Sequence, residues 1–522
     1  MHNSDYFTLF ILVLSAVSLA LRLTSRASVE VRRGIVAIGS TIVYYGFDPH
    51  GLPICLGLVA INWVLGRAIV LSPHHRKSTL LICGLTLDLG LLAAYKYLGA
   101  IIAGLGPTYS VELGLGFPLG LSFIVFRLVS HLVDAHAGGE VARSPLDLLC
   151  YALFFPAILC GPLIRYEAMM SQDRLGRTTS VDWSIGLALI GIGMFKNLMI
   201  SPAIAAVADK VFVPWLAEQP IPVTGAWIGM IAYGFQVYFD FSGYSDAAIG
   251  VARLLGVELP ANFHSPFKAR SMVDFWQRWH VSLTRFLTIY VYNTVTLTMA
   301  RKIGAKASAV KQFVWRIAYP TTLVMFLMGI WHGDHLTFAM FGLYHGVLLV
   351  VNHAWRNFGG RYRKAALASD WWPTIALGLT FLAVAAGWAI FRASNPGRAF
   401  AMLGTLLGRS EWTGATLASS AWPSHLADPL LTTGGAMPIT VADIALLLAL
   451  FLIVWVLPNS NQTLSRFNPV FEGGGYPKIA PSTEALKLSL SPAWALSVSC
   501  LLVWSVVAFL SNDRAALLYF HF

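Results

Sequence analysis

The sequence predicts an all-α integral membrane protein, and two observations lead to this fold class. Hydrophobic residues make up 57% of the 522 residues and charged residues only 12%, whereas soluble domains carry roughly 25% charged residues. The apolar residues also form long continuous blocks, and a helix needs about 20 such residues to cross a bilayer. Backbone amides in lipid must be bonded internally, which leaves helices or closed barrels, and barrel strands would alternate in hydrophobicity. We therefore expect a bundle of about 11 to 14 membrane-spanning helices.

The net charge of +11 and the five cysteines exclude several other classes. The basic residues gather in short connectors rather than in one stripe, so we expect no nucleic-acid partner. The cysteines form no C-x-x-C pair, which argues against a disulfide framework or a cysteine metal site. The block from Tyr6 to Leu23 has almost no basic residue before it and is interpreted as the first span rather than as a cleaved signal.

Basic residues alternate between successive connectors. The connector after the first span carries four arginines and the third carries Arg76 and Lys77, whereas residues 47–51 and 106–116 hold neither lysine nor arginine. By the positive-inside rule the basic connectors, including Arg301 to Lys311, lie in the cytoplasm and the N-terminus lies outside. We therefore expect a multi-pass membrane protein.

Further spans are expected near residues 147–164, 183–207, 225–252, 313–330, 335–355, 372–391, 440–457 and 492–511. Two prolines interrupt residues 155–162, which predicts a re-entrant or kinked element that lines a cavity. Residues 271–292 carry too many polar groups for a lipid-facing helix. Residues 408–438 and Pro458 to Leu486 are the expected long loops.

Ionisable groups at membrane depth are costly and are therefore functional candidates. One cluster consists of Asp240, Ser242, Tyr244 and Asp246. On a continuous helix the two aspartates point about 120° apart, which makes a poor catalytic dyad, although Gly243 offers a possible break. We favour a structural role, in which each aspartate caps a half-helix or pairs with an arginine such as Arg253 or Arg270.

A second cluster contains Arg278, Trp279 and His280. Tryptophan and arginine favour the membrane interface, so residues 274–283 are interpreted as an amphipathic element at that depth. His280 is either an acid–base group or ligand, or a histidine hydrogen-bonded within the helix packing.

A third cluster contains Trp331 and His332, the latter near small glycines that allow close approach of a substrate or another backbone. An imidazole there can act as a general base, or it can be a core histidine bonded to a carbonyl. His332, His335 and His345 lack a carboxylate or cysteine at suitable spacing, so we predict no metal site.

These residues belong to stretches that resemble the membrane-bound O-acyltransferase (MBOAT) family, in its bacterial alginate O-acetylation and D-alanyl transfer branch. The matching stretches are FPLGLSFIVFRLVSHLVD (117–134), CGPLIRYEAM (160–169), residues 233–287, GIWHGDHLTFAMFGLYHG (329–346), AGWAIFRA (386–393) and the closing LLYFHF (517–522). They divide the chain into N-terminal helices (1–116), a catalytic core (117–393) and a loop with C-terminal helices (394–522).

The resemblance implies that His332 is the essential catalytic histidine and that His280 is the family's second recurrent polar position. It implies a bundle around a central funnel or tunnel, in which a cytoplasmic acyl thioester, acetyl-CoA or an acyl carrier protein, meets a hydroxyl acceptor. No bound cofactor is expected. The partners implied are membrane lipid, a glycan acceptor and a periplasmic esterase-like acyltransferase. Candidate residues that bind substrate or line the tunnel are Asp240, Ser242, Tyr244, Asp246, Arg278, Trp279, Trp331 and His345.

The chain departs from this branch after the tryptophan–histidine motif. The branch usually has an Arg-Asp pair and a Pro-Leu-Gly-Gly-like turn, where this chain has Thr288-Ile289 and Asn293-Thr294-Val295. The leading hypothesis is O-acetylation of an exported polysaccharide or envelope glycan. The alternatives are acyl or D-alanyl transfer from a carrier protein, and a proton-coupled transporter or flippase, a class that often shows two related halves not seen here.

Overall fold

The computed structural model describes residues 3–104, 117–216, 221–304, 306–409, 439–473, 476 and 491–511. These residues form helices and connectors, with no strand among them. Seven of the described helices are long and apolar enough to cross a membrane, which confirms the predicted all-α membrane fold. Residues 410–438 of the first predicted loop, residues 474, 475 and 477–486 of the second, and the stretch 517–522 lie outside the described residues.

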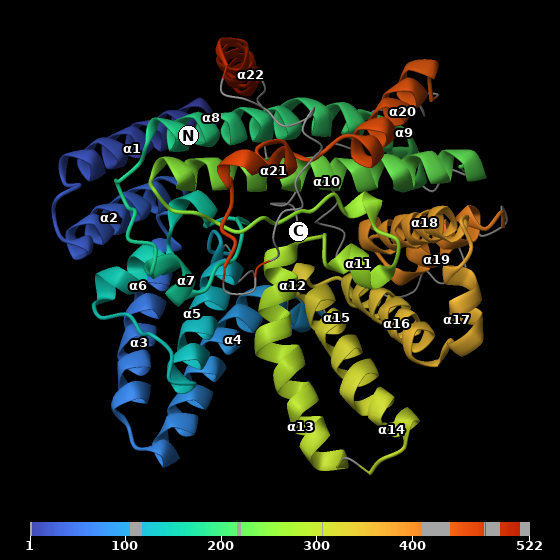
Figure 1. Cartoon of the computed structure of the whole chain (residues 1–522), viewed down its shortest axis with the longest axis horizontal. Coiled ribbons are helices and arrows are strands. Elements are labelled where there is room, and N and C mark those ends of the chain that lie inside the picture. Colours follow the sequence, from blue (N-terminus) through green and yellow to red (C-terminus); the bar gives the residue numbers. More distant parts are fainter. Residues whose placement is uncertain are drawn as a thin grey trace. The chain divides into compact units, whose positions relative to one another are not determined.

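The chain forms two compact units, and each is described by itself. Unit 1 comprises Met1–Met199, Phe241–Asn262 and Ser460–Phe520, and unit 2 comprises Ile200–Asp240, Phe263–Asn459 and His521–Phe522. The elements of unit 1 are α1 (Asn3–Leu23), α2 (Val29–Phe47), α3 (Leu52–Leu71), α4 (His74–Gly104), α5 (Leu121–His136), α6 (Pro145–Ala152), η2 (Phe155–Ala157), α7 (Tyr166–Met170), α8 (Ser180–Phe195), the π-helical turn η3 (Lys196–Ile200), the end of α10 (Val223–Leu254), α21 (Ser460–Thr463), η9 (Ser465–Phe467) and α22 (Pro492–Ser511) (Figure 1).

Contacts in unit 1 agree with the predicted alternation of connectors. The Asp48 carboxylate accepts hydrogen bonds from the backbone N–H groups of Gly51 and Leu119, so the connectors after α2 and before α5 lie together. The hydroxyl of Ser78, beside the basic third connector, lies 3.2 Å from the His136 ring at the end of α5. The third connector therefore lies on the same side of unit 1 as the end of α5. This is the expected arrangement, because α4 and α5 run in opposite directions between these two points.

The span expected near 147–164 is wrong, because α6 ends at Ala152 and irregular backbone follows. Two prolines prevent a helix there, and the backbone groups that it would have paired need other partners. The buried Arg127 guanidinium donates to the carbonyls of Tyr151, Ala152 and Ala157. The expectation of a broken element within residues 155–162 is confirmed.

Glycines bring α8 against the end of α10. A Cβ on Gly193 would lie 2.4 Å from the carbonyl oxygen of Gly243, and a Cβ on Gly250 would lie 2.5 Å from that of Gly186. The two contacts are seven residues apart on each helix, so they repeat on one face of each. Small residues at such crossings let the backbones approach closely. Gly243 therefore does not break α10, which runs as one helix from Val223 to Leu254.

Unit 2 contains the remaining elements. They are α9 (Ser201–Leu216), the first part of α10, η4 (Pro266–Lys268), α11 (Met272–Trp276), α12 (Val281–Leu287), the π-helical turn η5 (Thr288–Tyr292), α13 (Asn293–Ile303), α14 (Ala309–Phe313), the π-helical turn η6 (Val314–Ala318), α15 (Tyr319–His332), α16 (Leu336–Phe358), α17 (Gly360–Leu367), α18 (Trp372–Arg392), α19 (Pro396–Leu406) and α20 (Val441–Val456).

The α15–α16 crossing is the closest in unit 2. A Cβ on Gly329 would lie 2.3 Å from the carbonyl oxygen of Phe338, and a Cβ on Gly342 would lie 2.2 Å from that of Met325. Gly329, one turn before His332, therefore accommodates another backbone. The sequence predicted that glycines near His332 would allow close approach either of a substrate or of another backbone, and the second applies to Gly329. This crossing fixes the end of α15, where His332 lies, against the start of α16.

Candidate active site

His280 lies at a sharp change of chain direction between α11 and α12. Its backbone is left-handed, with φ 43° and ψ 51°, and its side chain is only 3% exposed. A non-glycine residue in this conformation costs on the order of 1–3 kcal/mol, and such residues cluster at functional sites. His280 therefore occupies a strained, buried position at the start of α12.

The interpretation of residues 274–283 as an interfacial amphipathic element is wrong. The rings of Trp276 and Trp279 are 5% and 6% exposed, so they are core residues. Trp279 stacks on Phe275 with 5.6 Å between ring centroids.

The Arg278 side chain has a structural role, because its hydrogen bonds are to the chain around α11. Its Nε donates to Asp274 Oδ1 over 2.6 Å, and its guanidinium also donates to the carbonyl oxygen of His264. The His264 N–H in turn donates to the Arg278 carbonyl oxygen. These bonds fasten the segment before α11 to the turn that carries His280.

His332 is the last residue of α15, and the helix stops because Gly333 adopts an extended backbone. The His332 side chain is half-buried, in contrast to the buried His280. The Trp331 ring lies between the two histidines, with its centroid 4.8 Å from the His332 ring and 6.2 Å from the His280 ring. The structure therefore brings both predicted catalytic residues to one aromatic side chain.

Four aromatic rings surround the His332 imidazole, and we call them the aromatic chamber. Their centroids lie 4.8 to 6.3 Å from that of His332, and the residues are Trp331, Phe338, Phe341 and Phe391. Sequence reasoning did not single out the three phenylalanines. Their only signal was that they fall in the stretches 329–346 and 386–393.

His345 lies within the same helix pair as His332 and is 1% exposed. Its ring centroid is 4.5 Å from that of Phe341 and 5.2 Å from that of Trp276. A Cβ on Gly387 would lie 2.7 Å from its Nε2 atom, so a larger residue at this position of α18 would displace the imidazole. Phe341 contacts both His332 and His345, which makes His345 part of the wall behind the chamber.

The predicted polar cluster of α10 is divided between the two units. Asp240 belongs to unit 2 and is 6% exposed, while Ser242, Tyr244 and Asp246 belong to unit 1. Both aspartates lie inside one continuous helix, so neither caps a half-helix. The Tyr244 hydroxyl is hydrogen-bonded to the backbone of Leu159 and Cys160 in the irregular segment of unit 1.

Asp246 pairs with a lysine, not with the arginine suggested by the sequence. Lys196 Nζ lies 2.6 Å from Asp246 Oδ2, and the Ser460 hydroxyl donates to the same oxygen over 2.6 Å. Lys196 begins the π-helical turn η3, directly after α8. The partners lie 50 and 214 residues away in sequence, so no local pattern could identify them.

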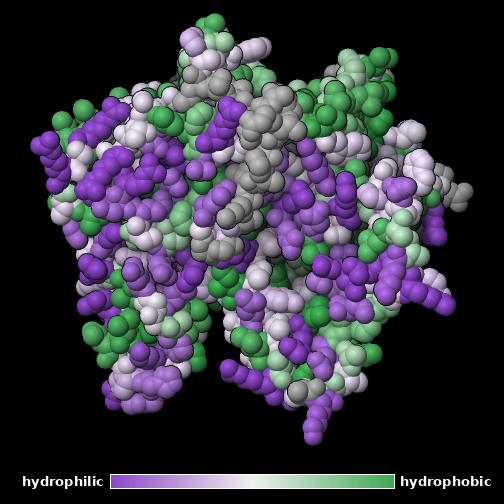
Figure 2. All heavy atoms as spheres, in the orientation of Figure 1, coloured by the Kyte–Doolittle hydropathy of each residue, from purple (hydrophilic) through white to green (hydrophobic). Residues whose placement is uncertain are grey.

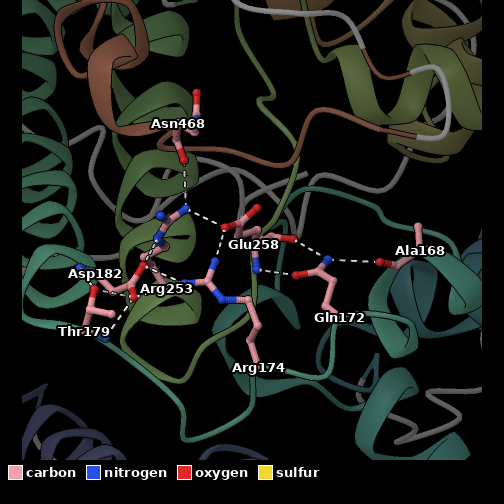
Figure 3. Close-up of polar contacts among 8 residues, drawn as sticks. All are labelled: Ala168, Gln172, Arg174, Thr179, Asp182, Arg253, Glu258 and Asn468. Carbon is pink, nitrogen blue, oxygen red and sulfur yellow. Dashed lines mark hydrogen bonds and ion pairs between the residues drawn. The ribbon is translucent and has the colours of Figure 1, made fainter.

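Arg253, one of the suggested partners, belongs to a different network in unit 1 (Figure 3). Its guanidinium donates to Asp182 and Glu258, and the Arg174 guanidinium donates to the same two carboxylates. Two positive and two negative charges balance, and a further bond to the Asn468 carbonyl oxygen ties in the segment before α22. This network is a structural clamp between connectors.

No group of three histidine, cysteine, aspartate or glutamate side chains could hold a metal ion in the described part of the chain. The residues that the structure brings together here are imidazoles and aromatic rings. A half-buried imidazole packed against aromatic rings can exchange a proton with a reactant.

Comparison with known proteins places these residues in a family. The profile of the membrane-bound O-acyltransferase family matches residues 121–382, which include His280, His332 and His345. The chain is 31% identical to the probable alginate O-acetylase AlgI of Pseudomonas syringae pv. tomato, over 73% of this chain and 71% of that protein. It is 28% identical to the peptidoglycan O-acetyltransferase of Helicobacter pylori, over 72% and 73% of the two chains. It is 30% identical to the teichoic acid D-alanyltransferase of Bacillus subtilis, over 57% of this chain and 78% of that protein.

Proposed function

The chain belongs to the membrane-bound O-acyltransferase family and is an acyltransferase, and from that premise we propose that it O-acetylates an exported polysaccharide. The acetyl group would come from a thioester on the cytoplasmic side of a bacterial inner membrane. Membership of an enzyme family also argues against the alternative of a proton-coupled transporter or flippase.

The extent of the matches favours acetyl over D-alanyl transfer. The relatives named for O-acetylation align over 60% to 73% of this chain, whereas the D-alanyltransferases align over 56% or 57%. Two of the polymers in these names, alginate and peptidoglycan, are carbohydrate-containing envelope or exported polymers that offer hydroxyl groups. The acceptor proposed for this chain is therefore a hydroxyl on a glycan.

The observation that carries the proposal is the half-buried His332 imidazole inside the aromatic chamber. In the proposed reaction His332 takes the proton of the acceptor hydroxyl, and the hydroxyl oxygen forms a bond to the thioester carbonyl carbon. The carbon–sulfur bond then breaks, and the leaving thiolate takes the proton back from the imidazolium. An ester and a thiol are formed, and the imidazole returns to its neutral state.

His280 supports this reaction as a positioning residue in our proposal. Its side chain is 3% exposed, and its ring contacts the Trp331 ring, which in turn contacts His332. A buried imidazole of this kind is out of reach of a bulky glycan. Its strained backbone would instead fix the tryptophan that forms one wall of the chamber.

Membrane vesicles from bacteria that express the chain test the donor and the acceptor together. Radiolabelled acetyl-CoA, acetyl groups on an acyl carrier protein, and D-alanine on its carrier protein are supplied in parallel to inside-out vesicles. We expect alkali-labile label in polysaccharide with an acetyl thioester. Label only from D-alanine would refute acetylation, and label that requires an added periplasmic esterase-like protein would assign the final step to a partner.

A further inference from the structure

Positive charge is concentrated in one stretch of unit 2. No acidic residue occurs between Asp274 and Asp334 or between Asp334 and Asp370. Residues 301–316 and 356–364 within these two stretches carry nine basic residues, namely Arg301, Lys302, Lys306, Lys311, Arg316, Arg356, Arg361, Arg363 and Lys364. These stretches therefore have a much greater excess of positive charge per residue than the chain as a whole, whose net charge is +11.

These residues lie on the helical hairpin of α12 to α15, at the end of α16 and on α17. Residues 281–303 and Ala309–His332 form the two arms of a helical hairpin, joined where α13 meets α14 (Figure 1). The Thr296 hydroxyl donates to the Arg316 carbonyl oxygen across the arms. The Phe313 ring at the end of α14 meets the Phe358 ring at the end of α16, with 5.1 Å between centroids, so the end of α16, which leads into α17, packs against this arm of the hairpin. We call the nine basic residues on these elements the basic ledge.

The basic ledge is accessible and electrically uncompensated. Eight of its nine residues are exposed and Arg363 is half-exposed. None forms an ion pair with another residue in the described ranges. Hydrophilic side chains cover the tip of the α13–α14 hairpin and α17 on the face shown in Figure 2. By contrast, arginines of unit 1 such as Arg32, Arg174 and Arg253 are paired with carboxylates.

Exposed aromatic and apolar side chains are interleaved with these charges. The exposed fraction is 41% for Trp315, 42% for Tyr319, 65% for Tyr362 and 74% for Trp371. Leu367, at the end of α17, is 56% exposed. Tryptophan and tyrosine are enriched at the boundary between lipid and water, and basic amphipathic helices lie in that plane. An acidic soluble protein would match the charges but would leave these rings in water.

The helical segment that joins the ledge to His332 is about as long as a bilayer core is thick. The helical segment Ala309–His332 has 24 residues, and at 1.5 Å per residue it spans about 36 Å. That length is close to the thickness of a bilayer core, about 30 Å. Lys311 of the basic ledge and His332 therefore lie near opposite ends of a helical segment about as long as a bilayer core is thick.

We propose that the basic ledge binds the phosphate headgroups of anionic phospholipids in the cytoplasmic leaflet. The cations would contact the headgroup phosphates, while Trp315, Tyr362, Leu367 and Trp371 enter the boundary of the acyl chains. Binding at this level fixes the depth of the hairpin whose two arms carry His280 and His332 at their other ends.

Lipid retention in detergent tests the proposal. The purified full chain is incubated with equal amounts of phosphatidylglycerol and phosphatidylcholine, and the lipids that remain bound are counted by native mass spectrometry. One variant replaces Lys302, Lys311 and Lys364 by glutamine. A matched control replaces Arg26, Arg76 and Lys77, which removes the same charge from unit 1. Thermal unfolding and size-exclusion profiles of both variants are compared with those of the unaltered chain.

We expect the unaltered chain and the control to bind more phosphatidylglycerol than phosphatidylcholine. In the ledge variant the ratio of bound phosphatidylglycerol to bound phosphatidylcholine should fall about tenfold. Equal preference in the ledge variant and the unaltered chain would overturn the proposal, and so would an equal loss in the control. Two competition arms exclude other anions. Displacement of the lipid by free coenzyme A, or ledge-dependent binding of an acidic acyl carrier protein without lipid binding, would also overturn it.

Discussion

Phe391 of α18 packs edge to face on His332, with 5.0 Å between the ring centroids and 84° between the ring planes. This contact is made across the bundle, between the stretch 386–393 and the stretch 329–346. It orients the imidazole proposed as the general base, because a ring held on one edge loses freedom to turn. The predictions that follow begin from this contact.

Replacing Phe391 by alanine should leave a void beside His332 and release the imidazole. Misplacement of a catalytic group by about 1 Å can lower a rate roughly 100-fold, so we expect kcat for acyl transfer to fall by about 10- to 100-fold. Steady-state rates in membranes measure the effect. Phe400→Ala, at a position that is 51% exposed in α19, is the control, and equal activity of the two variants would contradict the role of Phe391.

Gly342→Ala should destabilise unit 2. The added Cβ would lie 2.2 Å from the Met325 carbonyl oxygen and 3.0 Å from the Gly329 Cα, and overpacking of this kind costs about 1–3 kcal/mol. Thermal unfolding in detergent gives the size of the loss. Gly378→Ala is the matched control, because a Cβ there meets nothing within 4 Å. If both variants unfold at the same temperature, the close α15–α16 crossing is refuted.

Lys196→Met should destabilise unit 1 by about 3–5 kcal/mol, because it leaves the buried Asp246 carboxylate unpaired. Asp246 is 6% and Lys196 13% exposed as side chains. The double variant Lys196→Met/Asp246→Asn should recover much of the loss, since no unpaired charge remains. Stability is measured by thermal unfolding in detergent.

The surface pair Arg177–Asp173 provides the comparison for that experiment. Its side chains are 50% and 57% exposed, and exposed ion pairs contribute about 0–1 kcal/mol. Arg177→Met should therefore lower stability much less than Lys196→Met does. A double variant of Lys196 and Asp246 that is less stable than Lys196→Met alone would contradict the assigned ion pair.

The sequence predicted the helices better than it predicted the partners of polar residues. Apolar blocks of about 20 residues determine membrane helices through local composition, and α16, α18 and α22 follow the predicted ranges closely. The failure near residues 147–164 has a local cause as well. The block was apolar enough to span, but two prolines removed the backbone donors that a helix needs.

The sequence predicted the histidines of the site but not the residues that surround them. His332 and His280 stand out because ionisable groups are rare in apolar sequence, and the resemblance added their roles. Phe391 and Phe341 are ordinary apolar residues, and only the packing of α18 and α16 against α15 identifies them. In the same way Asp246 was recognised as a buried charge, while Lys196 could be assigned only after α8 and α10 were placed side by side.

Acetylation by the His332→Ala variant, compared with His335→Ala, tests the central claim most directly. His335 lies three residues away with a side chain 30% exposed, and it has no role in the proposed reaction. With all chains at equal levels in the membrane, ester-linked acetyl in the cell's polysaccharide is measured per unit of protein. The account predicts a loss of about 10²- to 10⁴-fold for His332→Ala and near-normal acetylation for His335→Ala. Full acetylation with His332→Ala would contradict the assignment of His332 as the general base.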